Sequence, residues 1–129
     1  MQPIELLVVD NNISDIFLIR QALAEEPYPS NIRVAPDSPR ACQMMAASHI
    51  QPDLVILDLN LPKLSGLAVL ESIDPNVPVV VFTSSTTAID RRMAFELGVV
   101  DYVEKPPHPT EFIEAVSRIV KQWVAVPVG

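Results

Sequence analysis

Short apolar runs alternate with helical patterns five times along this chain, and this alternation limits the possible folds more than any other feature. The apolar runs span residues 4–9, 31–35, 53–57, 78–82 and 99–103. Each has the length of a strand, and most carry hydrophobic residues at consecutive positions, as strands buried on both faces do. Because helices separate them, the strands cannot pair as hairpins. The pattern therefore predicts a parallel sheet with helices on both faces.

The segments between the runs carry the spacing and end signals of helices. We expect helices over residues 14–25, from about 37–39, through Leu67, Leu70 and Ile73, over 88–97, and from about 108–110. Ser14 and the hydroxyls of residues 83–86 are the expected N-caps, and Gly98 is the expected helix end. The last helix is expected to bury Phe112, Val116, Ile119 and Val120.

Composition bounds the class of protein. The 129 residues suit one domain, and the 49% hydrophobic content suffices for a core. The 9 basic and 16 acidic residues give a net charge of −7, which argues against nucleic-acid or anionic membrane partners. No apolar run approaches the roughly 20 residues of a membrane span. No signal peptide is recognisable and Cys42 is the single cysteine, so we expect a cytoplasmic protein.

Ionisable or hydrogen-bonding residues follow four of the five expected strands. They are Asp10 and Asn11, Asp58, Thr83 and Ser84, and Lys105. The carboxyl ends of parallel strands form one edge, where such sheets carry their chemistry. An aspartate there can attack phosphorus and form an aspartyl phosphate, with Mg²⁺ neutralising the phosphoryl oxygens. Asp10 and Asp58 could hold the ion, while Lys105 and Thr83 could contact the phosphoryl group.

Motifs in this order resemble the receiver domain of bacterial response regulators. They span residues 6–10, 53–62 with Gly66, 80–84 and 101–106. The resemblance implies a single-domain, flavodoxin-like (βα)5 fold, a doubly wound parallel sheet with strand order 2-1-3-4-5. Residues 15–23 are most similar to single-domain regulators paired with bacterial phytochrome-type histidine kinases. We expect residues 1–122 to form the receiver domain. Residues 123–129 are then an apolar tail without an obvious place in the core, for which we favour a dimer or partner contact.

The resemblance also implies roles for individual residues. Asp58 would be the phosphoacceptor, with Lys105, Thr83 and Ser84 contacting the phosphoryl group. Thr83 and Tyr102 would form the switch. Asp10, Asp58 and the backbone carbonyl of Asn60 would hold Mg²⁺, with a weak contribution from Asn11. Pro62, Gly66 and Pro106 would shape the loops, and the Lys105–Pro106 bond would be cis.

Position 11 departs from the family pattern. The family usually has two acidic residues after the first strand, whereas this chain has Asp10 followed by Asn11 and Asn12. An asparagine offers a carbonyl oxygen but no charge, so the expected carboxylates in the pocket fall from three to two. We expect Mg²⁺ binding to weaken by about one to a few kcal/mol, with phosphorylation retained.

The sequence thus predicts a phosphorylatable response regulator of a two-component phosphorelay. A histidine kinase or phosphotransfer protein would donate the phosphoryl group, and the signal would leave by contact with a downstream protein target. A phosphorylation-independent pseudo-receiver adaptor is the alternative, supported by Asn11, and a metal-dependent phosphohydrolase ranks third. Taken singly, the site residues also have structural interpretations, as turn or cap residues, a solvated lysine or, for Tyr102, a packed strand residue.

Overall fold

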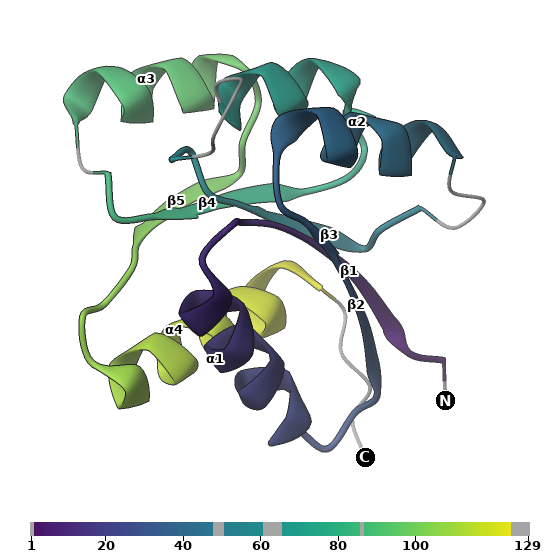
Figure 1. Cartoon of the computed structure of the whole chain (residues 1–129), viewed down its shortest axis with the longest axis vertical. Coiled ribbons are helices and arrows are strands. Elements are labelled where there is room, and N and C mark those ends of the chain that lie inside the picture. The colour runs from purple at the N-terminus through teal and green to yellow at the C-terminus, as the bar shows by residue number, and fades with distance from the viewer. Residues whose placement is uncertain (1, 48–50, 61–65, 86, 125–129) are drawn as a thin grey trace.

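The computed structural model of the chain describes residues 2–47, 51–60, 66–85 and 87–124, and strands and helices alternate along them (Figure 1). In chain order the elements are β1 (Ile4–Val9), α1 (Ile13–Ala24), β2 (Ser30–Ala35), α2 (Ser38–Ala47), β3 (Leu54–Leu57), the 3-10 helix η1 (Gly66–Ser72), β4 (Val79–Thr83), α3 (Ala88–Glu96), β5 (Asp101–Glu104) and α4 (Pro109–Trp123).

The strands of the described residues form a single parallel sheet in the order β2-β1-β3-β4-β5. This confirms the predicted 2-1-3-4-5 order and the flavodoxin-like fold. α1 and α4 cover one face of the sheet, and α2, η1 and α3 cover the other (Figure 1). The strand order reverses at β1, because β2 lies on one side of it and β3 on the other. Such a reversal opens a crevice at the carboxyl ends of the central strands.

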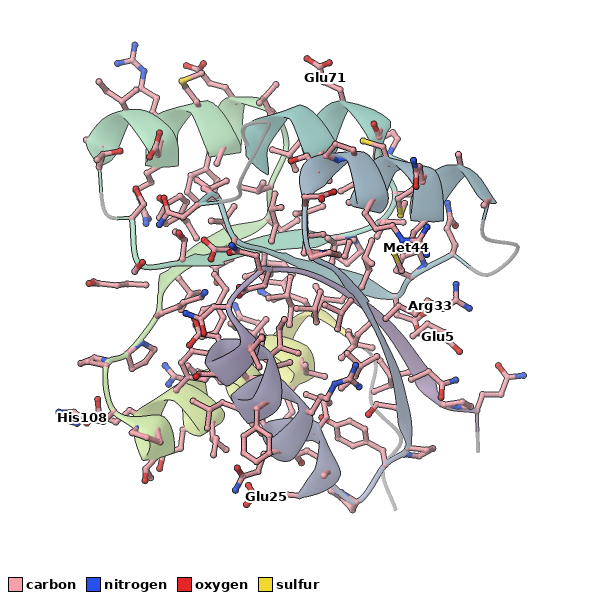
Figure 2. All side chains as sticks on the ribbon, in the orientation of Figure 1. Glu5, Glu25, Arg33, Met44, Glu71 and His108 are labelled. Carbon is pink, nitrogen blue, oxygen red and sulfur yellow. The ribbon has the colours of Figure 1, made fainter. Side chains whose placement is uncertain are left out.

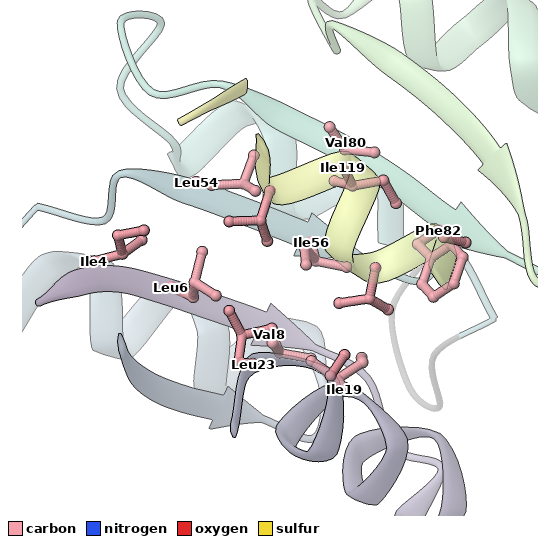
Figure 3. Packing of buried hydrophobic residues seen from close by; sticks show 14 of the residues in the cluster. Ile4, Leu6, Val8, Ile19, Leu23, Leu54, Ile56, Val80, Phe82 and Ile119 are labelled. Carbon is pink, nitrogen blue, oxygen red and sulfur yellow. The ribbon is translucent and has the colours of Figure 1, made fainter. Parts of the chain in front are cut away.

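The sheet separates two hydrophobic clusters, as expected when successive strand residues point to opposite faces. Leu6 and Val8 of β1 point into the cluster under α1 and α4, which Figure 3 shows in close-up. Leu7 and Val9 point into the cluster under α2, η1 and α3. Both faces of the central strands are thus buried, which explains their continuous hydrophobic runs.

Two helix starts differ from those predicted. α1 begins at Ile13, and its N-cap is Asn12 instead of Ser14, because Oδ1 of Asn12 accepts a hydrogen bond from the backbone N of Asp15 at 3.1 Å. α3 is capped by Thr87, one residue beyond the predicted hydroxyl run. Asparagine and threonine both cap helices well, so neighbouring candidates were hard to separate from sequence.

Two elements in the second half also differ. The predicted third helix is the 3-10 helix η1. β5 begins at Asp101, two residues later than predicted, because Gly98 and Val99 still close the end of α3. The backbone N of Gly98 donates to the carbonyl of Phe95 at 3.1 Å, and that of Val99 donates to the carbonyl of Ala94 at 3.2 Å. Gly98 has a φ of +101°, in agreement with its predicted role.

The C-terminal helix extends further than expected. α4 runs to Trp123, and both Trp123 and Val124 pack partly buried against the first cluster. The prediction that the tail has no place in the core is therefore wrong for these two residues, since an added half-turn of helix carries Trp123 over the cluster. Residues 125–129, the rest of the predicted contact segment, lie outside the described residues.

Several polar side chains lie at the periphery of this body. Glu25, Glu71 and His108 point outward from the ends or outer sides of their elements (Figure 2). Across the described part of the chain, no helix combines the length and the apolar character that crossing a membrane requires.

Candidate functional site

Strand register places Asp10 beside Asp58. β1 and β3 pair so that Val9 lies opposite Leu57, and the backbone N of Asp58 donates to the carbonyl of Val9 at 2.9 Å. Each aspartate is thus the first residue beyond its strand, at the same edge of the sheet. Both are buried, with exposed fractions of 2% and 5%.

β4 and β5 bring Thr83 and Lys105 to this edge. Thr83 lies opposite Glu104, and the backbone N of Lys105 donates to the carbonyl of Thr83 at 2.9 Å. The Thr83 side chain is fully buried, so its hydroxyl needs a partner inside the protein. It donates to Oδ1 of Asp58 at 2.8 Å.

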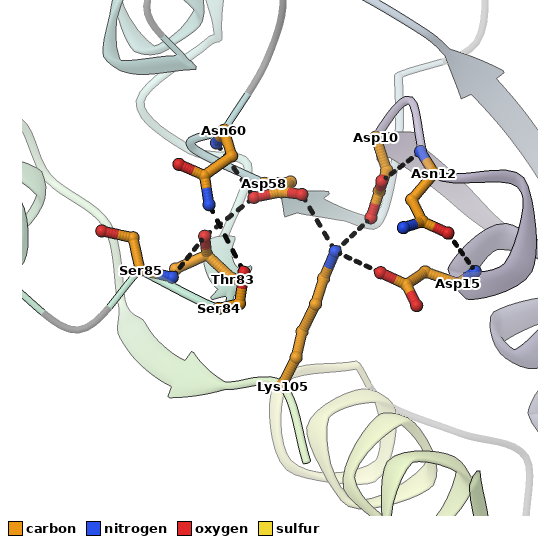
Figure 4. Close-up of polar contacts among 9 residues, drawn as sticks. All are labelled: Asp10, Asn12, Asp15, Asp58, Asn60, Thr83, Ser84, Ser85 and Lys105. Atoms are coloured by element: carbon orange, nitrogen blue, oxygen red, sulfur yellow. Dashed lines mark hydrogen bonds and ion pairs between the residues drawn. The ribbon is translucent and has the colours of Figure 1, made fainter. Parts of the chain in front are cut away.

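The ammonium of Lys105 lies at the centre of the cluster (Figure 4). Its Nζ is 2.8 Å from Oδ2 of Asp10, 2.8 Å from Oδ2 of Asp15 and 2.9 Å from Oδ2 of Asp58. These contacts match the three donors of an ammonium. Burial alone would lower the pKa of Lys105, but the hydrogen bonds and charges of the carboxylates outweigh burial and raise this pKa. Lys105 therefore carries its charge throughout the neutral range.

Burial removes water from the carboxylate of Asp10 and makes its charged form less favourable. Burial raises the pKa of Asp10, although hydrogen bonds from Lys105 and from the backbone N of Asn12 act in the opposite direction. One ammonium is shared by Asp10, Asp15 and Asp58, so the cluster keeps an excess of buried negative charge. An additional cation would relieve that excess.

Asp58 receives donors on both oxygens. Oδ2 faces Lys105, whereas Oδ1 accepts from Thr83 and from the backbone N of Asn60 at 3.0 Å. Donors placed in this way can also stabilise oxygens of a group attached to the carboxylate.

A chain of hydrogen bonds leads from Asp58 to the face that carries Tyr102. Oγ1 of Thr83 donates to Asp58 and accepts from the backbone N of Ser85 at 3.2 Å. The carbonyl of Ser85 in turn accepts from the hydroxyl of Tyr102 at 2.8 Å. Tyr102 is 8% exposed, and the guanidinium of Arg91 lies 5.6 Å from the centroid of its ring. A change at Asp58 can therefore reach Tyr102 through two residues.

Of the remaining predicted residues, Ser84 and Asn11 lie outside the buried cluster around Lys105. Ser84 is exposed, and its Oγ accepts from Nδ2 of Asn60 at 3.4 Å. Asn11 is exposed, and its side chain has no hydrogen bond or ion pair with another described residue. Gly66 begins η1, and Pro62 lies outside the described residues.

The predicted cis bond at Pro106 is absent, because no cis peptide bond occurs in residues 2–47, 51–60, 66–85 or 87–124. The trans form is favoured by about 0.5–1 kcal/mol for a bond to proline.

Asp15 is a site residue that the sequence did not lead us to predict. It follows the first strand by several residues, so a search limited to strand ends overlooks it. The spacing from Asn12 to Asp15 is that of an N-cap and its partner, which places Asp15 in the first helical turn above the strand edge. That signal was available in the sequence.

The donor set is suited to a hard divalent cation. Asp10 and Asp58 provide buried carboxylate oxygens, which Mg²⁺ prefers, at the point of excess negative charge. The three carboxylates surround the Lys105 ammonium and not a common empty point, and the described residues contain no group of three Asp, Glu, His or Cys side chains arranged to hold a metal. An incoming ion would therefore bind beside the lysine, on some of these oxygens.

Comparison with known proteins agrees with this geometry. Residues 6–117 match the response regulator receiver domain family. The probable transcriptional regulatory protein TcrX of Mycobacterium tuberculosis is 37% identical over 124 residues, covering 94% of this chain and 51% of the relative. The DNA-binding response regulator MtrA of the same species is 34% identical over 119 residues, covering 91% and 50%. The chain thus spans about half the length of these curated relatives.

Solved structures match along nearly the whole chain. The phosphorylated cyanobacterial phytochrome response regulator RcpA superposes with a TM-score of 0.90 at 31% identity, covering 98% of this chain and all of that one. The Mn²⁺-bound response regulator Rcp1 gives 0.86 at 27% identity, with coverage of 98% and 100%. Together with the family match, these similarities establish that this chain belongs to the receiver domains of two-component response regulators.

Proposed function

We propose that Asp58 accepts a phosphoryl group from the phosphohistidine of a histidine kinase or phosphotransfer protein. A carboxylate oxygen of Asp58 forms the new bond to phosphorus as the bond between phosphorus and the histidine nitrogen breaks, and the electron pair of that bond stays on the imidazole. Phosphoryl acceptance on aspartate is general in this family. The observation that carries the assignment to Asp58 is the convergence of Lys105, Thr83 and the Asn60 backbone N on its two oxygens.

Mg²⁺ fits the proposed reaction. Asp10, Asp58 and the backbone carbonyl of Asn60 would hold it, and the bound ion would neutralise phosphoryl oxygens. Mn²⁺ is present in the related structure of Rcp1, which supports a divalent ion here. Lys105 contributes a positive charge next to the phosphoryl group without a large movement of its side chain, because its Nζ is already 2.9 Å from Oδ2 of Asp58.

Thr83 and Tyr102 are the proposed switch. A phosphoryl group adds a charge of about −1.5 to −2 at Asp58. In the unmodified protein the Thr83 hydroxyl donates to Oδ1 of Asp58, and the phosphoryl oxygens would compete for this hydroxyl. Movement of Thr83 disturbs its contact with Ser85 and hence the carbonyl that holds Tyr102. The added charge thereby biases the face formed by α3, β5 and α4, where a downstream protein would bind.

The partners follow from this proposal in outline. The similarity to RcpA, described as a phytochrome response regulator, supports a phytochrome-type histidine kinase as donor. Recognition through protein contact with a downstream target, a dimer contact and a cytoplasmic location remain predictions. MtrA is described as DNA-binding, but the matched region covers only half of that protein.

The adaptor function remains the second candidate, and Asn11 is the observation that favours it. Its exposed, uncharged side chain leaves the metal site without the family's usual second acid after β1. Under this alternative, partner binding is insensitive to Mg²⁺ and to substitution of Asp58.

Modification by a small phosphodonor separates the two candidates. We expect acetyl phosphate with Mg²⁺ to add one phosphoryl group to the wild type, detected by intact mass, and Asp58→Asn to abolish the addition. Asp53→Asn is the matched control, because Asp53 precedes β3 at the opposite end of the same strand. An unmodified wild type, or equal modification of Asp58→Asn, contradicts the proposed function.

A further inference from the structure

Asp15 occupies a position in the site that its place in the sequence does not suggest. Its Oδ2 lies 2.8 Å from Nζ of Lys105, the same distance as Oδ2 of Asp10. The Asp15 side chain is 21% exposed, whereas those of Asp10 and Asp58 are 3% and 6% exposed. Asp15 therefore lies at the rim of the pocket, between the buried carboxylates and solvent.

The loop after β1 holds Asp15 there through two hydrogen bonds. The backbone N of Asn12 donates to Oδ1 of Asp10 at 2.9 Å, and Oδ1 of Asn12 accepts from the backbone N of Asp15 at 3.1 Å. The cap therefore fixes the first turn of α1 relative to Asp10 (Figure 4). The positive end of the helix dipole also favours a carboxylate at this point.

The charge balance of the site depends on Asp15. Around the Lys105 ammonium, the carboxylates of Asp10, Asp15 and Asp58 leave a net charge of −2. Without Asp15 the net charge would be −1, because Asn11 is neutral. A net charge of −2 balances the charge of a divalent cation. Each negative charge attracts the cation through a long-range Coulomb interaction, even where its carboxylate does not ligate the ion. The expected fall from three carboxylates to two, based on position 11 alone, is thus offset by position 15.

We infer that Asp15 is a positioning residue for the divalent cation, which supplies from the first turn of α1 the charge that Asn11 lacks. This inference rests on the proposed function. Asp15 acts through the electric field of its carboxylate. It also accepts one hydrogen bond of the Lys105 ammonium, so that the ammonium pairs less fully with the oxygens of Asp10 and Asp58. It is not proposed as a ligand of the ion.

Mn²⁺ binding tests this role without any phosphodonor. Binding is measured by the electron paramagnetic resonance signal of free Mn²⁺ for the wild type, Asp15→Asn, Asp53→Asn and the double variant Asp15→Asn/Asn11→Asp. We expect Asp15→Asn to bind about tenfold more weakly, and Asp53→Asn, which removes a distant charge, to stay within about twofold of the wild type. The double variant, with its charge restored at position 11, is expected to recover the wild-type affinity or exceed it.

The variant Asp15→Asn separates charge from structure, because asparagine keeps the size of the side chain and removes its charge. If Asp15 served only to start α1, this variant would bind Mn²⁺ as tightly as the wild type, and that result overturns the inference. A double variant that does not recover the wild-type affinity overturns it as well. Equal affinities of Asp15→Asn and Asp53→Asn also overturn it. Each of these results leaves phosphorylation of Asp58 by acetyl phosphate intact as a separate test, whereas a wild type that binds no Mn²⁺ counts against both proposals. Circular dichroism confirms that each variant is folded.

Discussion

At the scale of single residues, Lys105 is notable because its buried ammonium is the counter-charge of three carboxylates. Its side chain is 8% exposed and shares its charge among Asp10, Asp15 and Asp58. Removing charges from water is costly, so such a cluster is weak support for stability. Its arrangement is better explained by the need to keep a cation beside Asp58.

Replacing Lys105 by methionine should strongly destabilise the protein, because buried carboxylates then lack their counter-charge. We expect a loss of about 3–5 kcal/mol in the free energy of unfolding, measured by urea denaturation. Lys121→Met is the matched control. Lys121 is 55% exposed and pairs with Glu26 at 3.4 Å, so its loss should cost about 0–1 kcal/mol. If the two variants lose similar amounts of unfolding free energy, the three carboxylates do not need the Lys105 ammonium to remain stably buried.

The sequence was informative for residues that directly follow strands. Asp10, Asp58, Thr83 and Lys105 were predictable as neighbours because parallel strands end at a common edge and the side chains need no further placement. Asp15 was not predicted, because its place in the first turn of α1 follows from the Asn12 cap, whereas the expected cap was Ser14.

At the scale of elements, the end of α3 is fixed by backbone conformation. Gly98 has a φ of +101°, and a Cβ added to it would meet no atom within 4 Å. A substitution there meets open space, so any penalty arises from the backbone alone.

Gly98→Ala should therefore destabilise the protein by about 1–2 kcal/mol, because an L-residue with a side chain disfavours positive φ. Thermal denaturation provides the measurement, and Gly98→Asn should lose less, since asparagine tolerates this region better. A Gly98→Ala variant as stable as the wild type would mean that the turn readily adopts a negative φ.

Element types were predicted better than element boundaries. The five strands followed from the alternation of patterns, and their order followed from the resemblance to receiver domains. β5 began later than expected because Gly98 and Val99 still bond to α3. The 3-10 geometry of η1 was also missed. Its apolar spacing at Leu67, Leu70 and Ile73 fits a 3-10 helix and an α-helix almost equally well.

At the scale of the whole molecule, the helices on the two faces are anchored unequally. α4 buries Phe112, Ala115, Val116, Ile119 and Val120 against the sheet. Among its described residues, α3 buries Ala94 alone, while Ile89, Met93 and Phe95 are exposed by 40% or more. Opening α3 therefore exposes little additional apolar surface, so its local stability should be low.

This inequality predicts different protection from hydrogen exchange. Under native conditions, the amides of α3 should exchange at least about tenfold faster than those of α4, measured by residue-resolved NMR. α1 is the internal control for helix length, since it is 12 residues long and buries Ile19, Ala22 and Leu23, and it should be protected more than α3. Oγ of Ser85 donates to Asp90 in the first turn of α3, so the hydrogen bonds that start at Asp58 end at the least anchored helix. Protection of α3 equal to that of α4 would mean that a signal from Asp58 meets a rigid face, and the switch would then have to act through side chains such as Tyr102 alone.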